Sequence, residues 1–306
     1  MTRRMTRRVR AIAPAKLNWS LEVLRIRPDG YHEVRSIMQT LALHDSVTVE
    51  TAPSGVTIEV LGPAADLIAG LAPEDNLAWR AAVALRARLR AQRGARIVLE
   101  KHIPVAAGLG GGSSDAAAVL RALNVLWEAA EPAASLRRLA AKVGSDPPFF
   151  IAGGTAMVSG RGERVEPLPD AVAPSIMLAI PPAGERNEKT AAMYDALTPD
   201  EFSEGYVSLG VREAVEAGRM LTDELLANVF ERVTSQVQPD TERAMDALRA
   251  QGYVPHLAGS GPSFFLLYAG GADTADELAR RIRREAFEPV ATHTLRRRAA
   301  LRLERH

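Results

Sequence analysis

The residues most able to do chemistry in this chain form a glycine-rich stretch near its middle. Four glycines stand within the five positions from Gly108 to Gly112. Because glycine has no Cβ, such a backbone can adopt positive φ and bring its N–H groups close to an anion. Ser113 or Ser114 can cap a following helix, whose positive dipole end favours phosphate. The stretch therefore predicts a phosphate-binding loop at a helix N-terminus.

Two better-known phosphate loops do not fit this stretch. A Walker loop requires a lysine after its last glycine, and no lysine follows here. A dinucleotide-binding fingerprint counted from Gly108 would need glycine where Ser113 stands, and no strand with an acidic end follows Trp127. A flexible glycine linker is the plain alternative, but linkers rarely lie tightly between a strand and a helix.

Polar side chains near the start of the chain form a second candidate site. Residues 11–24 alternate as in a strand, which places Lys16, Asn18 and Ser20 on one face. That face suits either a ligand cleft or a half-solvated edge strand. A Pro-Asp-Gly turn then carries Tyr31 and His32, a pair suited to base stacking and hydrogen bonding or simply to surface packing.

Two further positions complete the candidates. Asp146 precedes a proline, which disfavours helical backbone at Asp146, so we expect its carboxylate at a turn, either functional or as a helix cap. Gly259-Ser260-Gly261 lies between two expected strands. It is either a second backbone anion site or a tight hairpin.

The elements that must position these residues follow from periodicity and turn residues. We expect strands over 11–24, 46–50, 56–61, 96–101, 175–180, 253–257, 263–268 and 288–294, the last closing the chain. Helices are expected from 76 to about 93 and over 114–127, 134–143, 188–197, 211–217, 241–251 and 273–285. A hairpin is expected from Gly153 through Gly162. The pattern is α+β, and from about residue 172 the order resembles a split βαβ, ferredoxin-like half.

Composition narrows the function classes. The 306 residues are 47% apolar and 25% charged, as in a soluble globular protein, with a formal net charge of +1. With no Cys and no close-spaced His, we expect no disulfide, thiolate nucleophile or bound metal ligand set. The start lacks an apolar signal-peptide core, so we expect a cytoplasmic protein. The Arg-rich ends are expected to be solvated faces or frayed tails, with no nucleic-acid or membrane partner.

Three motifs taken together resemble the GHMP kinase superfamily: Pro14-Ala15-Lys16-Leu17-Asn18, the Gly-Leu-Gly-Gly-Gly-Ser-Ser loop and Gly259-Ser260-Gly261. Pro28-Asp29-Gly30-Tyr31-His32-Glu33 and Gly144-Ser145-Asp146-Pro147 narrow the resemblance to members that phosphorylate a cytidine-diphosphate-linked methylerythritol on its 2-hydroxyl, in the non-mevalonate route to isopentenyl diphosphate. The resemblance covers residues 11–295. It implies a GHMP kinase fold, with a ribosomal-S5-like α/β domain over 1–171 and a ferredoxin-like domain over 172–306.

The resemblance also implies roles for individual residues. The catalytic pair falls on Lys16 and Asp146, with Asp146 as base and Lys16 as its electrostatic partner. The substrate would be bound by Asn18, Tyr31, His32, Thr190, Tyr194, Gly259 and Ser260. ATP would be bound by Pro104, Val105, Ala106, Ala107, Gly108, Leu109, Gly110, Gly111, Gly112, Ser113 and Ser114, with Asn76 and Lys101 near its adenosine. Mg²⁺ would bridge the phosphates, with Ser114 as a candidate ligand.

This chain departs from the family pattern in three places. Ser145-Asp146-Pro147-Pro148 stands where Ala-Asp-Val-Pro is common, which stiffens the segment. Ala106-Ala107 stands where further glycine is common, and Asp115 would repel phosphates if it faced them.

Two other readings stay open. One is another small-molecule GHMP kinase, of the homoserine or mevalonate type, for which the Tyr31-His32 pair would have no purpose. The other is a nucleotide-binding regulator on the same fold, which would need neither Lys16 nor Asp146. For the leading reading we expect a monomer or weak homodimer acting on a small-molecule substrate.

Overall fold

The computed structural model describes residues 7–182 and 189–305. Its first sheet is built around two long antiparallel strands, and its strand order is β12-β1-β2-β4-β3. In addition β5 pairs with β2, β6 pairs with β5, and β8 pairs with β1. One end of β2 pairs with β4 and the other end with β5. The strands are β1 (Arg8–Ile26), β2 (His32–Ala52), β3 (Val56–Leu61), β4 (Gly94–Glu100), β5 (Thr155–Gly160), β6 (Arg164–Pro167), β8 (Ala227–Asn228) and β12 (Leu303–Arg305).

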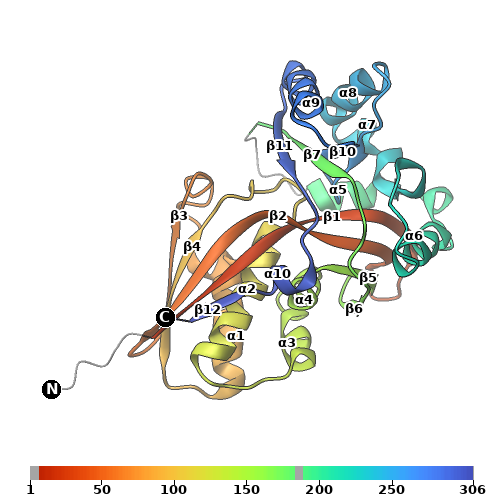
Figure 1. The fold of residues 1–306 in the computed structure, drawn as a ribbon. Helices are drawn as coiled ribbons and strands as arrows, with labels where there is room; N and C mark the ends of the chain where they lie inside the picture. The colour runs from red at the N-terminus through yellow and green to blue at the C-terminus, as the bar shows by residue number, and fades with distance from the viewer. Residues whose placement is uncertain (1–6, 183–188, 306) are drawn as a thin grey trace.

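Four helices pack against one face of this sheet (Figure 1). They are α1 (Leu77–Leu89), α2 (Gly111–Leu126), α3 (Ala133–Ala140) and α4 (Pro147–Ala152). The alanine-rich α2 lies against β1 and β2, because small side chains let its backbone approach the strands closely. Leu120, Leu123 and Trp127 are buried in this core, as the sequence predicts.

The second sheet has the strand order β11-β7-β10-β9, and all its pairs are antiparallel. In chain order this is 4-1-3-2, the ferredoxin-like arrangement that the sequence predicts. Its strands are β7 (Ser175–Ile180), β9 (His256–Leu257), β10 (Phe264–Tyr268) and β11 (Glu288–Thr292). The helices of this part of the chain are α5 (Lys189–Asp195), α6 (Tyr206–Glu216), α7 (Thr234–Val237), α8 (Pro239–Arg249) and α9 (Ala272–Arg284), of which α6 packs on β1 and β2 of the first sheet. Single 3-10 turns lie at η1 (Pro73–Asp75), η2 (Pro199–Glu201), η3 (Asp223–Leu225) and η4 (Val229–Arg232).

The two sheets share a buried core. Leu17 and Trp19 of β1 pack with Ile176, Leu178 and Phe265 of the second sheet, and the Trp19 and Phe265 rings meet edge to face at 6.0 Å. The strand over 11–24 is therefore buried on both faces, which rules out the half-solvated edge alternative. Its second face is the one that carries Lys16, Asn18 and Ser20, all buried.

The C-terminal segment differs from the expectation. The chain does not close on β11, because α10 (Arg297–Ala300) and β12 follow, and β12 pairs with β1 in the first sheet. The Arg297 guanidinium donates hydrogen bonds to the carbonyl oxygens of Gly153, Thr155 and Leu168. The prediction of a frayed Arg-rich tail at this end was wrong, because Arg297 is a structural donor that periodicity does not reveal.

Several boundaries also differ. The first helix ends at Leu89, because Arg90 adopts left-handed backbone at φ 50°, and the predicted strand 253–257 is reduced to His256–Leu257. Helix α4 was not predicted, although proline is well tolerated in a first helical turn, where its missing N–H costs little. In the helix expected over 188–197, residue 188 lies outside the described residues, as do residues 1–6 of the N-terminal Arg-rich end.

Candidate active site

The glycine-rich loop leads into α2 as expected, but its cap is not a serine. Gly110 is the N-cap residue at φ 73°, and Ser113 and Ser114 lie inside the first turn. The predicted serine cap was wrong, because only glycine adopts this left-handed conformation without cost. A Cβ on Gly110 would lie 2.9 Å from Lys16 Cγ, and one on Gly108 would collide with the carbonyl of Ala258. These two glycines are therefore required by the close approach of other chain segments.

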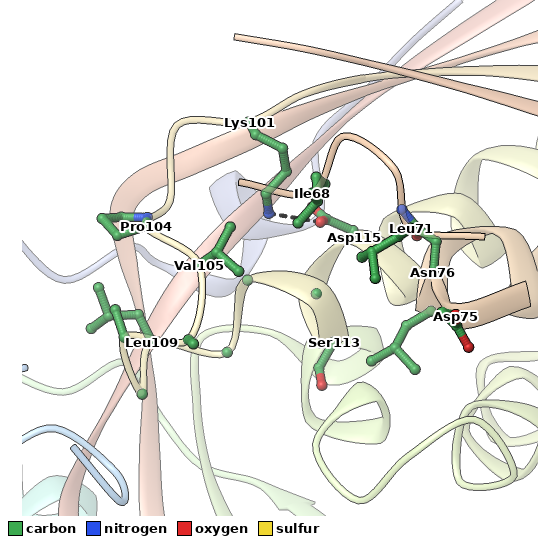
Figure 2. A pocket seen from close by; sticks show the side chains of 17 residues that line it. Ile68, Leu71, Asp75, Asn76, Lys101, Pro104, Val105, Leu109, Ser113 and Asp115 are labelled. Atoms are coloured by element: carbon green, nitrogen blue, oxygen red, sulfur yellow. Dashed lines mark hydrogen bonds and ion pairs between the residues drawn. The ribbon is translucent and has the colours of Figure 1, made fainter. Parts of the chain in front are cut away.

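This loop forms one wall of a cavity of about 290 Å³ (Figure 2). The lining residues are Ile68, Leu71, Asp75, Asn76, Leu77, Lys101, Pro104, Val105, Ala106, Ala107, Gly108, Leu109, Gly110, Gly111, Gly112, Ser113 and Asp115. Ser114 is fully buried behind them and does not line the cavity. Ile68 and Leu71 were missed, because they lie in an irregular segment that carries no periodic pattern.

Lys101 lines this cavity but is held by two carboxylates. Its Nζ forms ion pairs with Asp45 and, at 2.8 Å, with Asp115 (Figure 2). Asp45 also accepts hydrogen bonds from the backbone N–H groups of His102 and Ile103. Burial raises the pKa of Asp115 to about 8, although Lys101 opposes that rise. Asp115 thus turns to Lys101, and this buried triad ties both ends of the glycine-rich loop to β2.

Asn76 lines the same cavity and also caps a helix. Its Oδ1 accepts a hydrogen bond of 2.9 Å from Ala78 N at the start of α1. This hydrogen bond holds Asn76 at the start of α1, where it forms part of the cavity wall.

A second cavity, of about 250 Å³, contains the predicted catalytic pair. Its lining residues are Lys16, Asn18, Leu21, Val34, Ser36, Met38, Gly108, Gly110, Asp146, Val158, Arg161, Gly162, Thr190, Tyr194, Phe230, Gly259 and Ser260. Gly108 and Gly110 line both cavities, so the two meet at the glycine-rich loop.

Lys16 and Asp146 face this cavity without touching. The Lys16 amine donates a hydrogen bond of 3.0 Å to Asn18 Oδ1, and within the described part of the chain it forms no ion pair. Burial lowers the pKa of Lys16, while the charge of Asp146 raises it. Asp146 is the N-cap residue of α4 and makes no capping hydrogen bond, which leaves its carboxylate available. Its φ of −80° and ψ of −28° are helical, so the expected bias away from helical backbone was wrong, whereas the helix-cap position given as the alternative is where Asp146 lies.

Aromatic residues gather at the outer end of the second cavity. His32 stacks on Tyr194 at 4.8 Å, and the Tyr194 ring meets Phe230 edge to face. Tyr31 is 51% exposed and its ring lies beneath the Arg161 guanidinium at 5.0 Å. Neither Tyr31 nor His32 lines the cavity itself, whereas Arg161, which was not predicted, does.

The Gly259-Ser260-Gly261 loop closes the cavity from the second sheet. Asn228 Nδ2 donates to the carbonyl of Gly259 at 2.7 Å, and Gln238 Nε2 donates to that of Ser260 at 2.7 Å. Ser260 Oγ lies 2.9 Å from Thr190 Oγ1. Asn228 and Gln238 were not predicted, because both act through tertiary contacts with a loop that is distant in sequence.

Residues 7–182 and 189–305 contain neither a metal-binding cluster nor a membrane-spanning helix. No group of three or more His, Asp and Glu could hold a metal ion there. No described helix is long and apolar enough to cross a membrane.

The relatives of this chain in sequence and in structure identify its class, which is that of the GHMP kinases. Residues 76–154 match the model of the GHMP kinases N terminal domain. A 4-diphosphocytidyl-2-C-methyl-D-erythritol kinase of Dehalococcoides mccartyi is 39% identical over 285 residues, which are 93% of this chain and 97% of that protein. One of Pelotomaculum thermopropionicum is 40% identical over 289 residues, 94% and 98% of the two chains.

Solved structures agree with this class. A crystal structure of 4-(cytidine 5'-diphospho)-2C-methyl-D-erythritol kinase has a TM-score of 0.75 and 34% identity, over 93% of this chain and 98% of that one. A homoserine kinase from Cytophaga hutchinsonii has a TM-score of 0.73 at 16% identity, over 100% and 99% of the two chains, which shows the shared fold alone. The chain belongs to the GHMP kinase superfamily and, within it, to the family of 4-diphosphocytidyl-2-C-methyl-D-erythritol kinases.

Proposed function

We propose that this enzyme transfers the γ-phosphoryl group of ATP to the 2-hydroxyl of 4-diphosphocytidyl-2-C-methyl-D-erythritol, in the non-mevalonate route to isopentenyl diphosphate. The observation that carries this proposal is that the two cavities share Gly108 and Gly110. A nucleotide in the first cavity and an alcohol in the second would meet at the glycine-rich loop. Phosphoryl transfer depends mainly on such positioning and on charge neutralisation.

The acceptor side supplies a base and a cation. Asp146 takes the proton of the attacking hydroxyl, which its uncapped carboxylate supports. Lys16 stabilises the negative charge that develops on the transferred group and holds Asp146 ionised. Since the two side chains are not ion-paired, a substrate hydroxyl could lie between them.

The donor side holds ATP through backbone. The N–H groups at the start of α2 and the positive end of its dipole face the phosphates, and Ile68 and Leu71 offer an apolar wall to the base beside Asn76. Lys101 would act there mainly by fixing the loop, because its amine is already bonded to Asp45 and Asp115.

Ser114 does not fit the expected role of Mg²⁺ ligand, because its Oγ is fully buried and the residue lines neither cavity. Mg²⁺ bound together with ATP would neutralise phosphate charge, and no described side chain is proposed to hold it.

The cytidine side is supported by the aromatic end of the second cavity. The stacked His32 and Tyr194 rings offer hydrogen-bonding and stacking groups to a cytosine. Arg161 lies over the Tyr31 ring and bonds the carbonyl of Ala141, but within the described residues it forms no ion pair, so no carboxylate there competes with the substrate diphosphate for its charge.

A direct test measures ADP release from ATP and Mg²⁺ with three separate acceptors. We expect turnover with 4-diphosphocytidyl-2-C-methyl-D-erythritol and none above background with homoserine or mevalonate. Turnover with homoserine or mevalonate alone would overturn the substrate assignment, and His32→Ala should raise KM for the diphosphocytidyl acceptor while leaving KM for ATP unchanged.

A further inference from the structure

A chain of buried hydrogen bonds runs away from Lys16 through strands β1 and β2. Lys16 Nζ donates to Asn18 Oδ1 at 3.0 Å, and Asn18 Nδ2 donates to Ser36 Oγ at 2.7 Å. Ser36 in turn donates to the backbone carbonyl of Ser20. Lys16 is 5% exposed, Asn18 7% and Ser36 0%, so solvent cannot substitute for a missing partner.

The direction of every bond in this chain is set at its far end. The Ser20 carbonyl can only accept, so it takes the one proton of the Ser36 hydroxyl. Ser36 Oγ can then only accept from Asn18, which must present its NH₂ group. The amide oxygen of Asn18 is therefore turned toward Lys16.

The reverse orientation of the amide would be costly at both ends. An Asn18 NH₂ group facing Lys16 would set a donor against an ammonium, and the amide oxygen would face a Ser36 oxygen that has no proton to give. A buried polar group left unsatisfied costs about 1–3 kcal/mol, more when it is charged. Among the described residues only Lys16 and Ser36 bond the Asn18 amide, so Ser36 is the one partner besides Lys16 itself that sets its orientation.

We propose that Ser36 is a positioning residue for phosphoryl transfer, which fixes the Asn18 amide so that its oxygen holds the Lys16 ammonium in the second cavity. This inference rests on the proposed function, because it assumes that Lys16 acts on the transferred group. Ser36 acts through Asn18 and need not touch the transferred phosphoryl group.

The first test compares single variants by kcat and KM. Ser36→Ala should lower kcat about 10- to 100-fold, since small misplacement of a catalytic group has effects of this size, while KM for ATP stays within about twofold. Ser36→Cys keeps the volume with a weak hydrogen-bonding group and should show the same loss, which covers the case where Ser36→Ala folds poorly. The matched control is Ser46→Ala on the same strand, also buried, whose hydroxyl bonds Arg10 at 2.9 Å. It should keep wild-type kcat.

The second test separates orientation from packing. A carboxylate presents an oxygen to Lys16 in either orientation, so in an Asn18→Asp background the Ser36→Ala change should be neutral or should raise kcat. An equal loss in both backgrounds would overturn the inference, as would an unchanged kcat in both Ser36 variants.

Failure of the proposed function would look different. Wild-type enzyme would then leave 4-diphosphocytidyl-2-C-methyl-D-erythritol unphosphorylated. The same Ser36 comparison, made with whichever alcohol the wild type does phosphorylate, would still support or overturn the positioning role.

Discussion

The surroundings of Lys16 disfavour the charged form of its amine. Its side chain is buried, with Cγ beside Gly110 and the amine beside Gly259, and the amine finds one neutral acceptor in Asn18. Burial lowers its pKa, and only the charge of Asp146 opposes this. A lysine with a lowered pKa loses its proton, and with it its electrostatic role, at a pH below the usual lysine value of about 10.4.

The pH dependence of activity should report this pKa. We expect kcat to fall as pH rises through the lowered pKa of Lys16, because only the ammonium form is active. The other charged or titratable groups lining the cavity are Asp146, Arg161 and Tyr194, and burial raises the pKa of Tyr194 above its usual range, so it stays neutral. A pH–rate profile of the wild type checks this; a kcat that stays flat up to pH 10.4 would contradict it.

Asp146→Asn tests the base. The amide cannot take the hydroxyl proton, so we expect kcat to fall by about 10²- to 10⁴-fold with little change in either KM. Steady-state kinetics measure this, with the exposed Asp200→Asn as a control that should match the wild type. Full turnover by Asp146→Asn would show that Asp146 is not the general base.

At the scale of elements, two glycine loops from the two sheets meet over the active site. The carbonyls of Ala258 and Gly261 approach Gly108, and Gly259 packs against Lys16 Nζ and the carbonyl of Gly108. A side chain at Gly259, which has φ +64°, would displace the lysine or separate the loops. The contact between these two glycine loops therefore helps to position Lys16.

Gly259→Ala should consequently lose activity beyond its loss of stability. We expect kcat to fall at least about 100-fold, because Lys16 must move, along with some loss of thermal stability from the positive φ. Gly210→Ala in α6 is the control: no atom lies near its Cβ and its backbone is helical, so it should be neutral or stabilise by up to about 1 kcal/mol. Equal kcat in the two variants would contradict the role of the loop contact in positioning Lys16.

The sequence predicts local features of this site better than contacts between distant elements. The glycine-rich loop, the polar face of the first strand and the Gly-Ser-Gly turn each have a short-range signature, and all three meet at the cavities. The Asp45–Lys101–Asp115 triad and Arg161 have none, because each depends on a pairing across the fold. Helix α4 was missed for a different reason, since two prolines at its start resembled a turn.

At the scale of the molecule, the chain returns to its first sheet at the end. After β11 in the second sheet, α10 contacts β1, Arg297 bonds the carbonyls of Thr155 and Leu168, and β12 pairs with β1. This return could not be predicted, because Arg296-Arg297-Arg298 resembles a solvated charge run. We propose a domain boundary between residues 171 and 172. Residues 297–305 follow the second domain in the chain but pack on the first sheet.

Arg297→Ala should destabilise the protein and leave kcat unchanged. It removes a charged donor from three carbonyls, and we expect a loss of about 1.5–3 kcal/mol in unfolding free energy. Denaturant unfolding measures this, and the exposed neighbour Arg298→Ala should change it by less than about 0.5 kcal/mol. Equal stability of the two variants would contradict the anchoring role.

In the proposed reaction, the γ-phosphoryl group of ATP in the first cavity is transferred to one hydroxyl of the diphosphocytidyl acceptor in the second cavity. Phosphorus NMR of a single reaction containing ATP, Mg²⁺ and 4-diphosphocytidyl-2-C-methyl-D-erythritol tests it most directly. The account predicts one new phosphomonoester signal, assigned to the 2-hydroxyl and equal in amount to the ADP formed. Formation of ADP with inorganic phosphate alone, or a phosphomonoester at another hydroxyl, would contradict it.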